Sequence, residues 1–344
     1  MSLQATIAKL LLKLPASWKV KMAGGAPVVL GGRTLDPDFQ FLAHGAAKQP
    51  PMSSMEPEVA QAAAIEGLAM FAAKPEPGVS WEDTTIPGQG THQIPVRIYR
   101  PAQQNPDAPM MAYWHMGGGV ILDVEACHAF CTMVAKIAQC PIVSVDYRLA
   151  PQHKFPAGLE DCIAAYDWTL KNAESYGAPA GRAAIGGDSM GGNFSAIIAQ
   201  ESTRRGMPKP ELQLLLYPAT DLISEFGSAT TYAETYPLST DTMHWFMQQY
   251  LPEGFDRANV LLSPALETRL EGLPPAVIAT AGFDPLVDDG AAYAKKLEDA
   301  GVTVTFKCYD SLAHGFTAFT GIAPAAREAC LEIAGMVRDA YASL

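Results

Sequence analysis

The sequence predicts an α/β fold in which a mostly parallel sheet is flanked by helices. From about residue 81 onward, short apolar runs alternate with segments of helical periodicity, which is the pattern of repeated β-α-β units. A chain of 344 residues, 49% of them hydrophobic, can form a large core. Because no Gly/Ser linker, low-complexity tract or internal repeat divides the chain, we expect one large domain that carries an insertion.

The predicted strands are short apolar runs between turn signals. An early antiparallel strand is expected in "HQIPVRIYRP", residues 92–101. The other strands are expected, in chain order, at 109–115, 141–147, 182–188, 212–218, 275–282 and 304–310. Helices with apolar residues three and four positions apart are expected at 126–138, 157–173, 190–204, 288–300 and 324–342.

Two segments lie outside this alternation and predict a helical cap over the sheet. Residues 1–80 are helical in pattern and rich in Ala and Met, and residues 221–257 are longer than one crossover needs and rich in aromatic residues and Met. We expect residues 1–80 to be the N-terminal part of the cap, and residues 81–344 to be the main domain with a cap insertion at about 221–257. The alternative is that these apolar side chains belong to the core.

The segment 3–22, "LQATIAKLLLKLPASWKVKM", has the pattern of an amphipathic helix. Its apolar run is interrupted by Lys9 and Lys13 and is too short to span a bilayer. We expect this helix to pack on the body of the protein or on a partner, and we expect no membrane span.

The charge balance and the cysteines limit the classes of function. The chain has 24 Lys and Arg against 36 Asp and Glu, and a formal net charge of −12 at pH 7. Nucleic-acid binding is not expected, because affinity for a phosphate backbone requires clustered Lys and Arg. Cys127 and Cys131, four residues apart, could form a metal or redox pair, but the six cysteines include no C-x-x-C pair. We expect buried free thiols in a cytoplasmic protein without a metal site.

The segment "AAIGGDSMGGN", residues 183–193, places Ser189 in a G-x-S-x-G pattern between a predicted strand and a predicted helix. Glycines at 187 and 191 allow a sharp turn in which the serine takes a strained backbone conformation. Residues that follow parallel strands face the ligand crevice, and a helix N-terminus favours negative charge nearby. Ser189 is therefore a candidate nucleophile, and the alternative is a flexible surface loop that contains a serine.

A serine nucleophile needs a base, and the base needs a group that fixes its tautomer. Of the seven histidines, His314 lies in "DSLAHGF", a loop directly after the last predicted strand. Asp284 follows the predicted strand at 275–282, which fits the chain order serine, acid, histidine. We expect Asp284 to orient His314 and to stabilise its imidazolium. The rival acids are Asp221, Asp288 and Asp289.

A second glycine run, "YWHMGGGVILD" at 113–123, follows the strand expected at 109–115. Glycine runs are usually tight turns. Here the run could also direct backbone amides at the oxygen of a tetrahedral intermediate, together with the amide of Met190.

These blocks resemble the hormone-sensitive lipase family of α/β-hydrolases, which includes many bacterial esterases. The matching blocks, in family order, are "HMGGG", "VDYRLAPQHKFPAGLEDC", "GGDSMGGN", "DPLVDDGAAYAKKLEDAGV" and "HGF", and the likeness covers about 81–340. The resemblance implies an α/β-hydrolase fold with a mostly parallel eight-stranded sheet and a helical cap. Residues 81–344 are then the catalytic domain.

The resemblance also implies an activity and its residues. It implies a carboxylesterase that hydrolyses esters of short to medium acyl chains through an acyl-enzyme, without a cofactor and as a homodimer. The implied residues are the triad Ser189, Asp284 and His314, the oxyanion-hole amides of Gly117, Gly118 and Met190, and His115 as support for the loop. The alternatives are a ligand receptor on the same fold and a hydrolase of amides or lactones.

Two residues depart from the family pattern. Met116 replaces the first glycine of the usual His-Gly-Gly-Gly, and Gly119 stands where an aromatic residue is usual. The glycines that bear the implied amides are present. We therefore expect the change to reshape the pocket near the leaving group.

Overall fold

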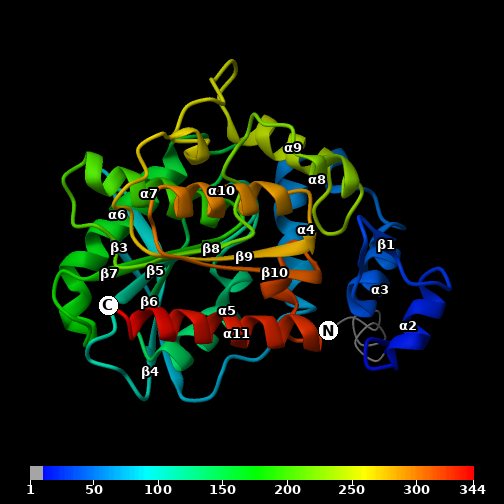
Figure 1. The fold of residues 1–344 in the computed structure, drawn as a ribbon, viewed down its shortest axis with the longest axis horizontal. Coiled ribbons are helices and arrows are strands. Elements are labelled where there is room, and N and C mark those ends of the chain that lie inside the picture. The colour runs from blue at the N-terminus through cyan, green and yellow to red at the C-terminus, as the bar shows by residue number, and fades with distance from the viewer. Residues whose placement is uncertain (1–10) are drawn as a thin grey trace.

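The structure, a computed structural model, describes residues 11–344 and is built around one large sheet. Its strands are β3 (Val79–Pro87), β4 (Gln93–Pro101), β5 (Met110–Trp114), β6 (Ile142–Val145), β7 (Ala183–Asp188), β8 (Gln213–Leu216), β9 (Ala276–Phe283) and β10 (Val304–Ala313). They follow the order β10-β9-β8-β7-β5-β6-β4-β3 (Figure 1). Strands β5 to β10 pair in parallel, whereas β4 is antiparallel to both of its neighbours. This is the predicted eight-stranded, mostly parallel sheet.

Each predicted strand overlaps an observed one, from β4 to β10. The early strand at 92–101 is β4, and it is antiparallel as expected. Strand β3, which the sequence pattern does not predict, pairs with β4 along its whole length at the edge of the sheet. Only Val79 and Ile86 of β3 are buried. The alternation of apolar and polar residues that indicates a half-buried strand is therefore absent there.

The predicted helices are confirmed and form two layers around the sheet. Their bounds are α5 His128–Ala138, α6 Ala157–Asn172, α7 Met190–Arg204, α10 Val287–Asp299 and α11 Pro324–Tyr341. Helices α5 and α11 pack against each other on one face, and α6, α7 and α10 cover the other face (Figure 1). Every residue of β5, β7 and β8 is buried between these layers. The carboxyl ends of these strands are therefore rigidly placed.

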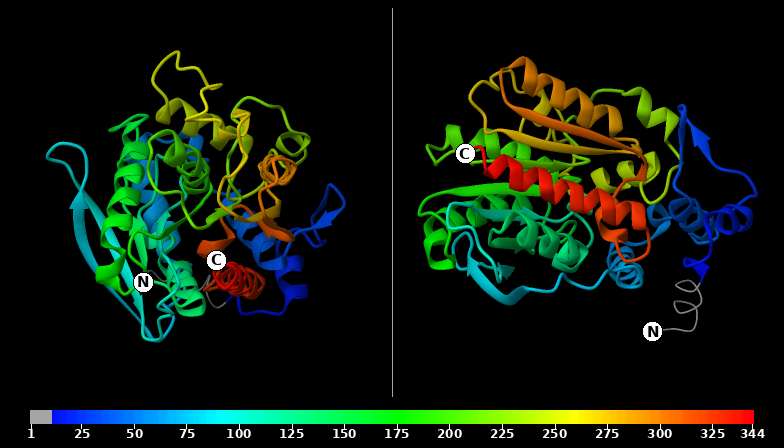
Figure 2. Two further views of the ribbon diagram at one scale, coloured as in Figure 1. Left: turned by 60° about the vertical axis from the view of Figure 1, so that its left-hand side comes forward. Right: turned by 60° about the horizontal axis from the view of Figure 1, so that its bottom comes forward.

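The N-terminal elements lie outside the sheet, at one side of the molecule (Figure 2). They are α2 (Ala16–Met22), the hairpin β1 (Val29–Leu30) and β2 (Arg33–Thr34), α3 (Pro37–Ala46) and α4 (Pro57–Ala69). The helix expected over 3–22 lies partly outside the described residues. Within them the prediction of one continuous helix is wrong, because Pro15 precedes the first turn of α2 and ends the preceding turn.

The 221–257 segment contains two short helices, α8 (Gly227–Thr231) and α9 (Thr240–Tyr250). One side chain of the N-terminal hairpin, Arg33, contacts both this segment and the last strand. Arg33 donates to the Tyr232 hydroxyl through Nη1 and to the Asp310 carboxylate through Nε, each at 2.9 Å. Arg33 thus connects three parts of the chain that are distant in sequence.

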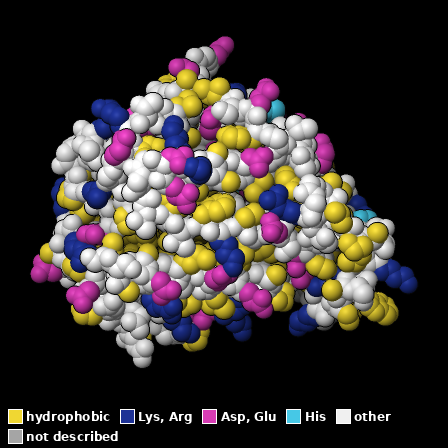
Figure 3. Space-filling view, viewed as in Figure 1, with side chains coloured by type: hydrophobic (Ala, Val, Ile, Leu, Met, Phe, Trp, Pro, Cys, Tyr) yellow, Lys and Arg dark blue, Asp and Glu magenta, His cyan; other side chains and the backbone are white. Residues whose placement is uncertain are grey.

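The surface carries charges of both signs. On the face in Figure 3, acidic and basic side chains are interspersed among hydrophobic ones. None of the helices within residues 11–344 combines the length and the apolar character needed to cross a membrane.

Candidate active site

Ser189 occupies the turn between β7 and α7, where the sequence predicts it. Its backbone has φ 57° and ψ −115°, in the positive-φ region that residues with a side chain rarely adopt. The Ser189 N–H donates to the carbonyl of Leu216 on the neighbouring strand at 2.8 Å. The strained turn is therefore held by the sheet, and it places the hydroxyl at the carboxyl ends of the strands.

The replacement Gly191→Ala should prevent stable folding. A Cβ at Gly191 would lie 1.9 Å from the carbonyl oxygen of Trp114, and no side-chain rotation can relieve a clash with a backbone atom. We expect a loss of at least about 4 kcal/mol in the free energy of unfolding. Soluble yield and urea unfolding measure the effect. Gly67→Ala, in helix α4 with open space around its Cβ position, is the matched control. Wild-type stability of Gly191→Ala would contradict the close packing of α7 against β5.

His314 and Asp284 meet Ser189 at the same end of the sheet. His314 directly follows β10, and its Nε2 lies 2.9 Å from the Ser189 Oγ. Asp284 directly follows β9, and its Oδ2 lies 2.7 Å from the His314 Nδ1. The other Asp284 oxygen accepts the N–H of Leu286 at 2.9 Å. All three side chains of this cluster are buried.

This geometry defines a direction for proton movement. A buried carboxylate beside Nδ1 favours the tautomer in which Nδ1 carries the proton and donates to Asp284. Nε2 is then an acceptor for the Ser189 hydroxyl proton. The arrangement can raise the nucleophilicity of the serine oxygen while the carboxylate stabilises the imidazolium that forms.

The rival acids have other partners. Asp221 Oδ1 accepts the N–H groups of Ile223 and Ser224 at 2.9 and 3.0 Å, as in a turn. Asp288 accepts the N–H of Ser228 at 2.9 Å. Asp289 accepts the N–H of Thr220 at 2.7 Å, and burial raises the pKa of its carboxyl to about 7. Asp284 is the carboxylate that contacts His314.

The second glycine run forms a loop after β5, and we call residues 115–120 the glycine loop. Its three glycines, Gly117, Gly118 and Gly119, have φ of 119°, 65° and 73°. The carbonyl of Gly117 accepts the N–H groups of Val120 and Ile121, both at 3.0 Å. The run is therefore a tight turn, as its composition indicates, and it needs glycines because of its positive φ angles.

Met116 and Met190 each lie next to a segment that carries a triad residue. A Cβ at Gly315, the residue after His314, would lie 3.2 Å from the Met116 sulfur, so Met116 packs over the loop that carries the imidazole. Met190 is the first residue of α7, where the N–H has no carbonyl of a preceding helical turn to pair with. The Met190 side chain is buried.

His115 is buried and lies against Tyr147. The two rings stack at 4.3 Å with an interplanar angle of 10°, and the Tyr147 hydroxyl donates to the His115 carbonyl at 2.8 Å. The His115 Nδ1 lies 2.7 Å from the Met116 carbonyl and donates to it. Burial lowers the pKa of His115 to about 4, so its imidazole is neutral near pH 7.

Sequence reasoning missed Asp188, a buried carboxyl next to the serine. Its Oδ2 accepts hydrogen bonds from the Tyr217 hydroxyl at 3.0 Å and from the Thr317 hydroxyl at 3.2 Å. The Tyr217 ring also lies 4.8 Å from the His314 ring. The pattern G-x-S-x-G leaves the residue before the serine unspecified, so only the fold brings these groups together.

The stability of the protein should depend on pH through Asp188. Burial raises the pKa of its carboxyl from 3.8 to about 6. The folded state therefore binds this proton more tightly than the unfolded state, and the contribution of Asp188 to stability falls as pH rises through 6. Relative to Asp188→Asn, the wild type should lose about 1.4 kcal/mol between pH 5 and pH 8. Urea unfolding of both proteins at both pH values measures the difference, and a pH-independent difference would contradict it.

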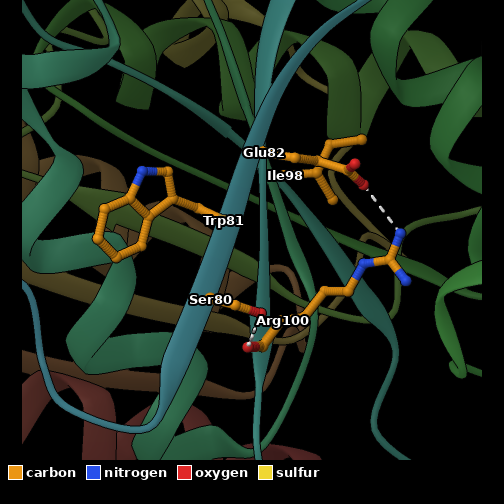
Figure 4. Close-up of a pocket in the computed structure, with 5 residues that line it drawn as sticks. All are labelled: Ser80, Trp81, Glu82, Ile98 and Arg100. Atoms are coloured by element: carbon orange, nitrogen blue, oxygen red, sulfur yellow. Dashed lines mark hydrogen bonds and ion pairs between the residues drawn. The ribbon is translucent and has the colours of Figure 1, made fainter.

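Two hollows lie outside the triad. One, of about 320 Å³, lies on the edge strand β3 and its neighbour β4 and is lined by Ser80, Trp81, Glu82, Ile98 and Arg100 (Figure 4). The Arg100 guanidinium there pairs with Glu82 at 2.9 Å. A second, of about 90 Å³, includes in its lining Thr317 and Ala318, which follow His314 in the sequence. Among the described residues, no group of three or more His, Cys, Asp or Glu side chains is arranged to hold a metal ion.

Comparison with known proteins agrees with the fold and the motifs. Residues 111–318 match the family described as alpha/beta hydrolase fold. The carboxylic ester hydrolase LipN of Mycobacterium tuberculosis is 37% identical over 316 residues, which are 90% of this chain and 84% of that protein. The ethyl acetate hydrolase of Pseudomonas putida is 35% identical over 79% of this chain and 86% of its own length.

Solved structures of esterases share the fold over most of the chain. An ester hydrolase from the metagenome of Lake Arreo, solved in complex with a derivative of bipyridine phosphonate, superposes with a TM-score of 0.84 at 37% identity. The alignment covers 89% of this chain and 98% of that one. The hyperthermophilic esterase of Pyrobaculum calidifontis has a TM-score of 0.80 at 36% identity, over 87% of this chain and 96% of that one. The chain belongs to the α/β-hydrolase fold family and, within it, to the hormone-sensitive lipase group of esterases.

Proposed function

We propose that Ser189 is the nucleophile, His314 the general base and Asp284 the orienting acid of a carboxylesterase. The chain is a serine ester hydrolase by family, since relatives named as ester hydrolases are 35–39% identical to it over most of its length. Ser189 attacks the ester carbonyl, and His314 takes its proton and returns it to the leaving alcohol. Water then hydrolyses the acyl-enzyme by the same route.

One observation carries the assignment of these residues. The Ser189 Oγ to His314 Nε2 distance of 2.9 Å and the His314 Nδ1 to Asp284 Oδ2 distance of 2.7 Å form an unbroken hydrogen-bonded chain. The chain joins residues that are 125 and 30 positions apart in sequence. A surface loop that happens to contain a serine has no reason to meet both groups in this order.

The oxyanion hole in this proposal consists of the amides of Gly117, Gly118 and Met190. The two glycines lie in the turn after β5 and Met190 begins α7, so all three donors adjoin the strand ends where Ser189 lies. Removal of one such donor typically lowers kcat by ~10²–10³-fold. His115 supports the glycine loop through the Met116 carbonyl, and its neutrality adds no charge near the oxyanion.

The preferred substrates in this proposal are esters of short to medium acyl chains. The relative from Pseudomonas putida is named an ethyl acetate hydrolase, which supports small substrates. Residues 1–80 and 221–257 act as the cap that shapes the pocket. The elements described between residue 11 and the start of β3 lie outside the sheet, as do α8 and α9, and Arg33 and Tyr232 connect the two segments.

Active-site labelling tests the proposal directly. The purified protein is incubated with the p-nitrophenyl ester of a short alkyl phosphonate, and the modified peptide is identified by mass spectrometry. We expect one phosphonyl group on Ser189 and a proportional loss of p-nitrophenyl butyrate hydrolysis. Hydrolysis that persists after complete labelling of Ser189, or absence of hydrolysis from the start, would overturn the assignment.

A second experiment distinguishes an esterase from an amidase. Hydrolysis rates are measured side by side on p-nitrophenyl butyrate, an ester, and on butyryl p-nitroanilide, the matching amide.

The oligomeric state and the location belong to the same proposal. Strand β10 is an edge strand, and Phe306 on it is exposed, which supports a homodimer through this edge. The six cysteines are free thiols, five of them buried, which supports a cytoplasmic location. Sedimentation equilibrium of the wild type and Phe306→Glu tests the dimer, and we expect the variant to be a monomer.

A further inference from the structure

We propose that Phe246 and Tyr250, two aromatic residues of helix α9, are positioning residues that hold the glycine loop in its catalytic shape. The inference rests on the proposed function, because it requires that the glycine loop supplies amides to the oxyanion. It makes the placement of α9 a determinant of turnover, and not only of the shape of the substrate pocket.

The two rings lie directly on the backbone of the loop. A Cβ at Gly118 would lie 2.4 Å from Cγ of Phe246, and a Cβ at Gly119 would lie 2.7 Å from Cε2 of Tyr250. Phe246 and Tyr250 are four residues apart on α9 and therefore lie on one face of the helix. Consecutive glycines of the loop thus contact consecutive turns of the same helix.

Both rings are themselves fixed in place. Phe246 and Tyr250 are buried, and the Tyr250 ring packs edge to face against Phe155 with centroids 5.9 Å apart. The carbonyl of Tyr250 accepts the N–H of Phe155 at 3.0 Å. The segment before Phe155 also contacts the loop, since the N–H of Ala150 donates to the carbonyl of Gly119 at 2.9 Å. The rings therefore contact the loop from a supported position.

A second contact holds the loop from helix α4. The Gln61 side chain donates through Nε2 to the carbonyls of Val120 at 2.8 Å and Ala150 at 3.2 Å. The glycine loop is consequently bounded by the catalytic sheet on one side and by α4 and α9 on the other. Both helices belong to the segments proposed to form the cap.

The flexibility of the three glycines explains why the glycine loop needs support from neighbouring side chains. A run of three glycines can adopt many backbone conformations, and only one of them directs the amides at the oxyanion. Misplacement of a catalytic group by about 1 Å can cost ~10²-fold in rate. Loss of either ring should therefore act on the transition state more than on substrate binding.

The test compares kcat, KM and the affinity for a transition-state analogue. In Phe246→Ala and Tyr250→Ala we expect kcat for p-nitrophenyl butyrate to fall by about 10- to 100-fold, with KM changed by less than about 3-fold. The Ki of a butyl trifluoromethyl ketone, whose hemiketal carries an oxyanion, should rise by the same factor as kcat/KM falls. Tyr250→Phe keeps the ring, and the Tyr250 hydroxyl has no partner among the described residues, so this variant should retain wild-type kcat.

A double-mutant cycle tests the contact itself. Gly119→Ala should lower kcat, because its Cβ would collide with the Tyr250 ring and its φ is 73°. In Gly119→Ala combined with Tyr250→Ala the collision is absent. The loss in the double variant should then be at least about 5-fold smaller than the product of the two single losses. Multiplicative losses would overturn the proposed contact.

Leu297→Ala, a buried truncation in α10 that belongs to a separate hydrophobic cluster, controls for lost stability. We expect it to lower the unfolding midpoint while kcat stays unchanged. Unchanged kcat in Phe246→Ala and Tyr250→Ala, or a rise in KM alone, would overturn the positioning role. If the wild type neither hydrolyses the ester nor binds the ketone, the proposed function fails instead, so the two failures are distinguishable.

Discussion

Replacement of Ser189 by alanine should lower kcat for ester hydrolysis by about 10⁶-fold, with little change in stability. The side chain supplies the attacking oxygen, and alanine leaves His314 without a proton to accept. Binding of the substrate does not require the hydroxyl, so an ester should still bind to the variant. Initial rates at saturating p-nitrophenyl butyrate measure the loss of kcat. Isothermal titration calorimetry with a non-fluorinated ketone analogue of the ester, which cannot be hydrolysed, measures whether the variant still binds.

Ser195→Ala is the matched control for this experiment. Ser195 lies on α7, the helix that follows Ser189, is fully buried and donates to the carbonyl of Gly191 at 3.0 Å. Its loss should cost about 1 kcal/mol of stability and leave kcat within about 2-fold of the wild type. An active Ser189→Ala would show that another residue is the nucleophile.

Asp284→Asn should lower kcat by about 10⁴-fold while KM stays nearly constant. The asparagine amide can present an N–H to His314 Nδ1, which favours the tautomer with the proton on Nε2. The imidazole then no longer accepts the Ser189 proton, and the developing imidazolium loses its carboxylate partner. Steady-state kinetics from pH 6 to pH 9 measure the effect.

The neighbouring acid Asp288 provides the comparison. Asp288→Asn removes a carboxylate of the same chain segment that contacts Ser228 and not His314, and it should retain kcat within about 3-fold. Equal losses of kcat in the two variants would mean that catalysis requires negative charge in this region, and not the contact of Asp284 with the His314 Nδ1.

The main features of the fold follow from sequence periodicity because the central strands of the sheet are buried on both faces. Apolar runs such as Ala183–Asp188 and Ala276–Phe283 are buried throughout, so the runs coincide with the strands. Only two residues of β3 are buried, so this strand does not form an apolar run and the sequence pattern does not predict it. In the N-terminal segment, the apolar periodicity indicates one continuous helix, but Pro15 interrupts it and α2 begins only after this residue.

The positions of Ser189, Asp284 and His314 were predictable because each follows a strand of a parallel sheet. The rule that strand ends face one crevice converts chain order into spatial proximity. The rule says nothing about residues that pack from outside the sheet. Phe246 and Tyr250 were expected in a cap, but periodicity gave no sign that their rings lie on Gly118 and Gly119.

Asp188 shows a second limit of sequence reasoning. Its polar partners Tyr217 and Thr317 come from segments 29 and 129 residues away. A carboxyl that is buried among distant partners cannot be distinguished in the sequence from an exposed one beside a turn.

The strand order has a consequence for how activity is acquired during synthesis. The hydroxyl, carboxylate and imidazole are contributed after β7, β9 and β10, and β10 is the outermost strand on its side. A chain that has docked every strand except this one contains the serine and the acid but has no base. Recovery of hydrolysis after dilution from denaturant therefore requires attachment of this outermost strand.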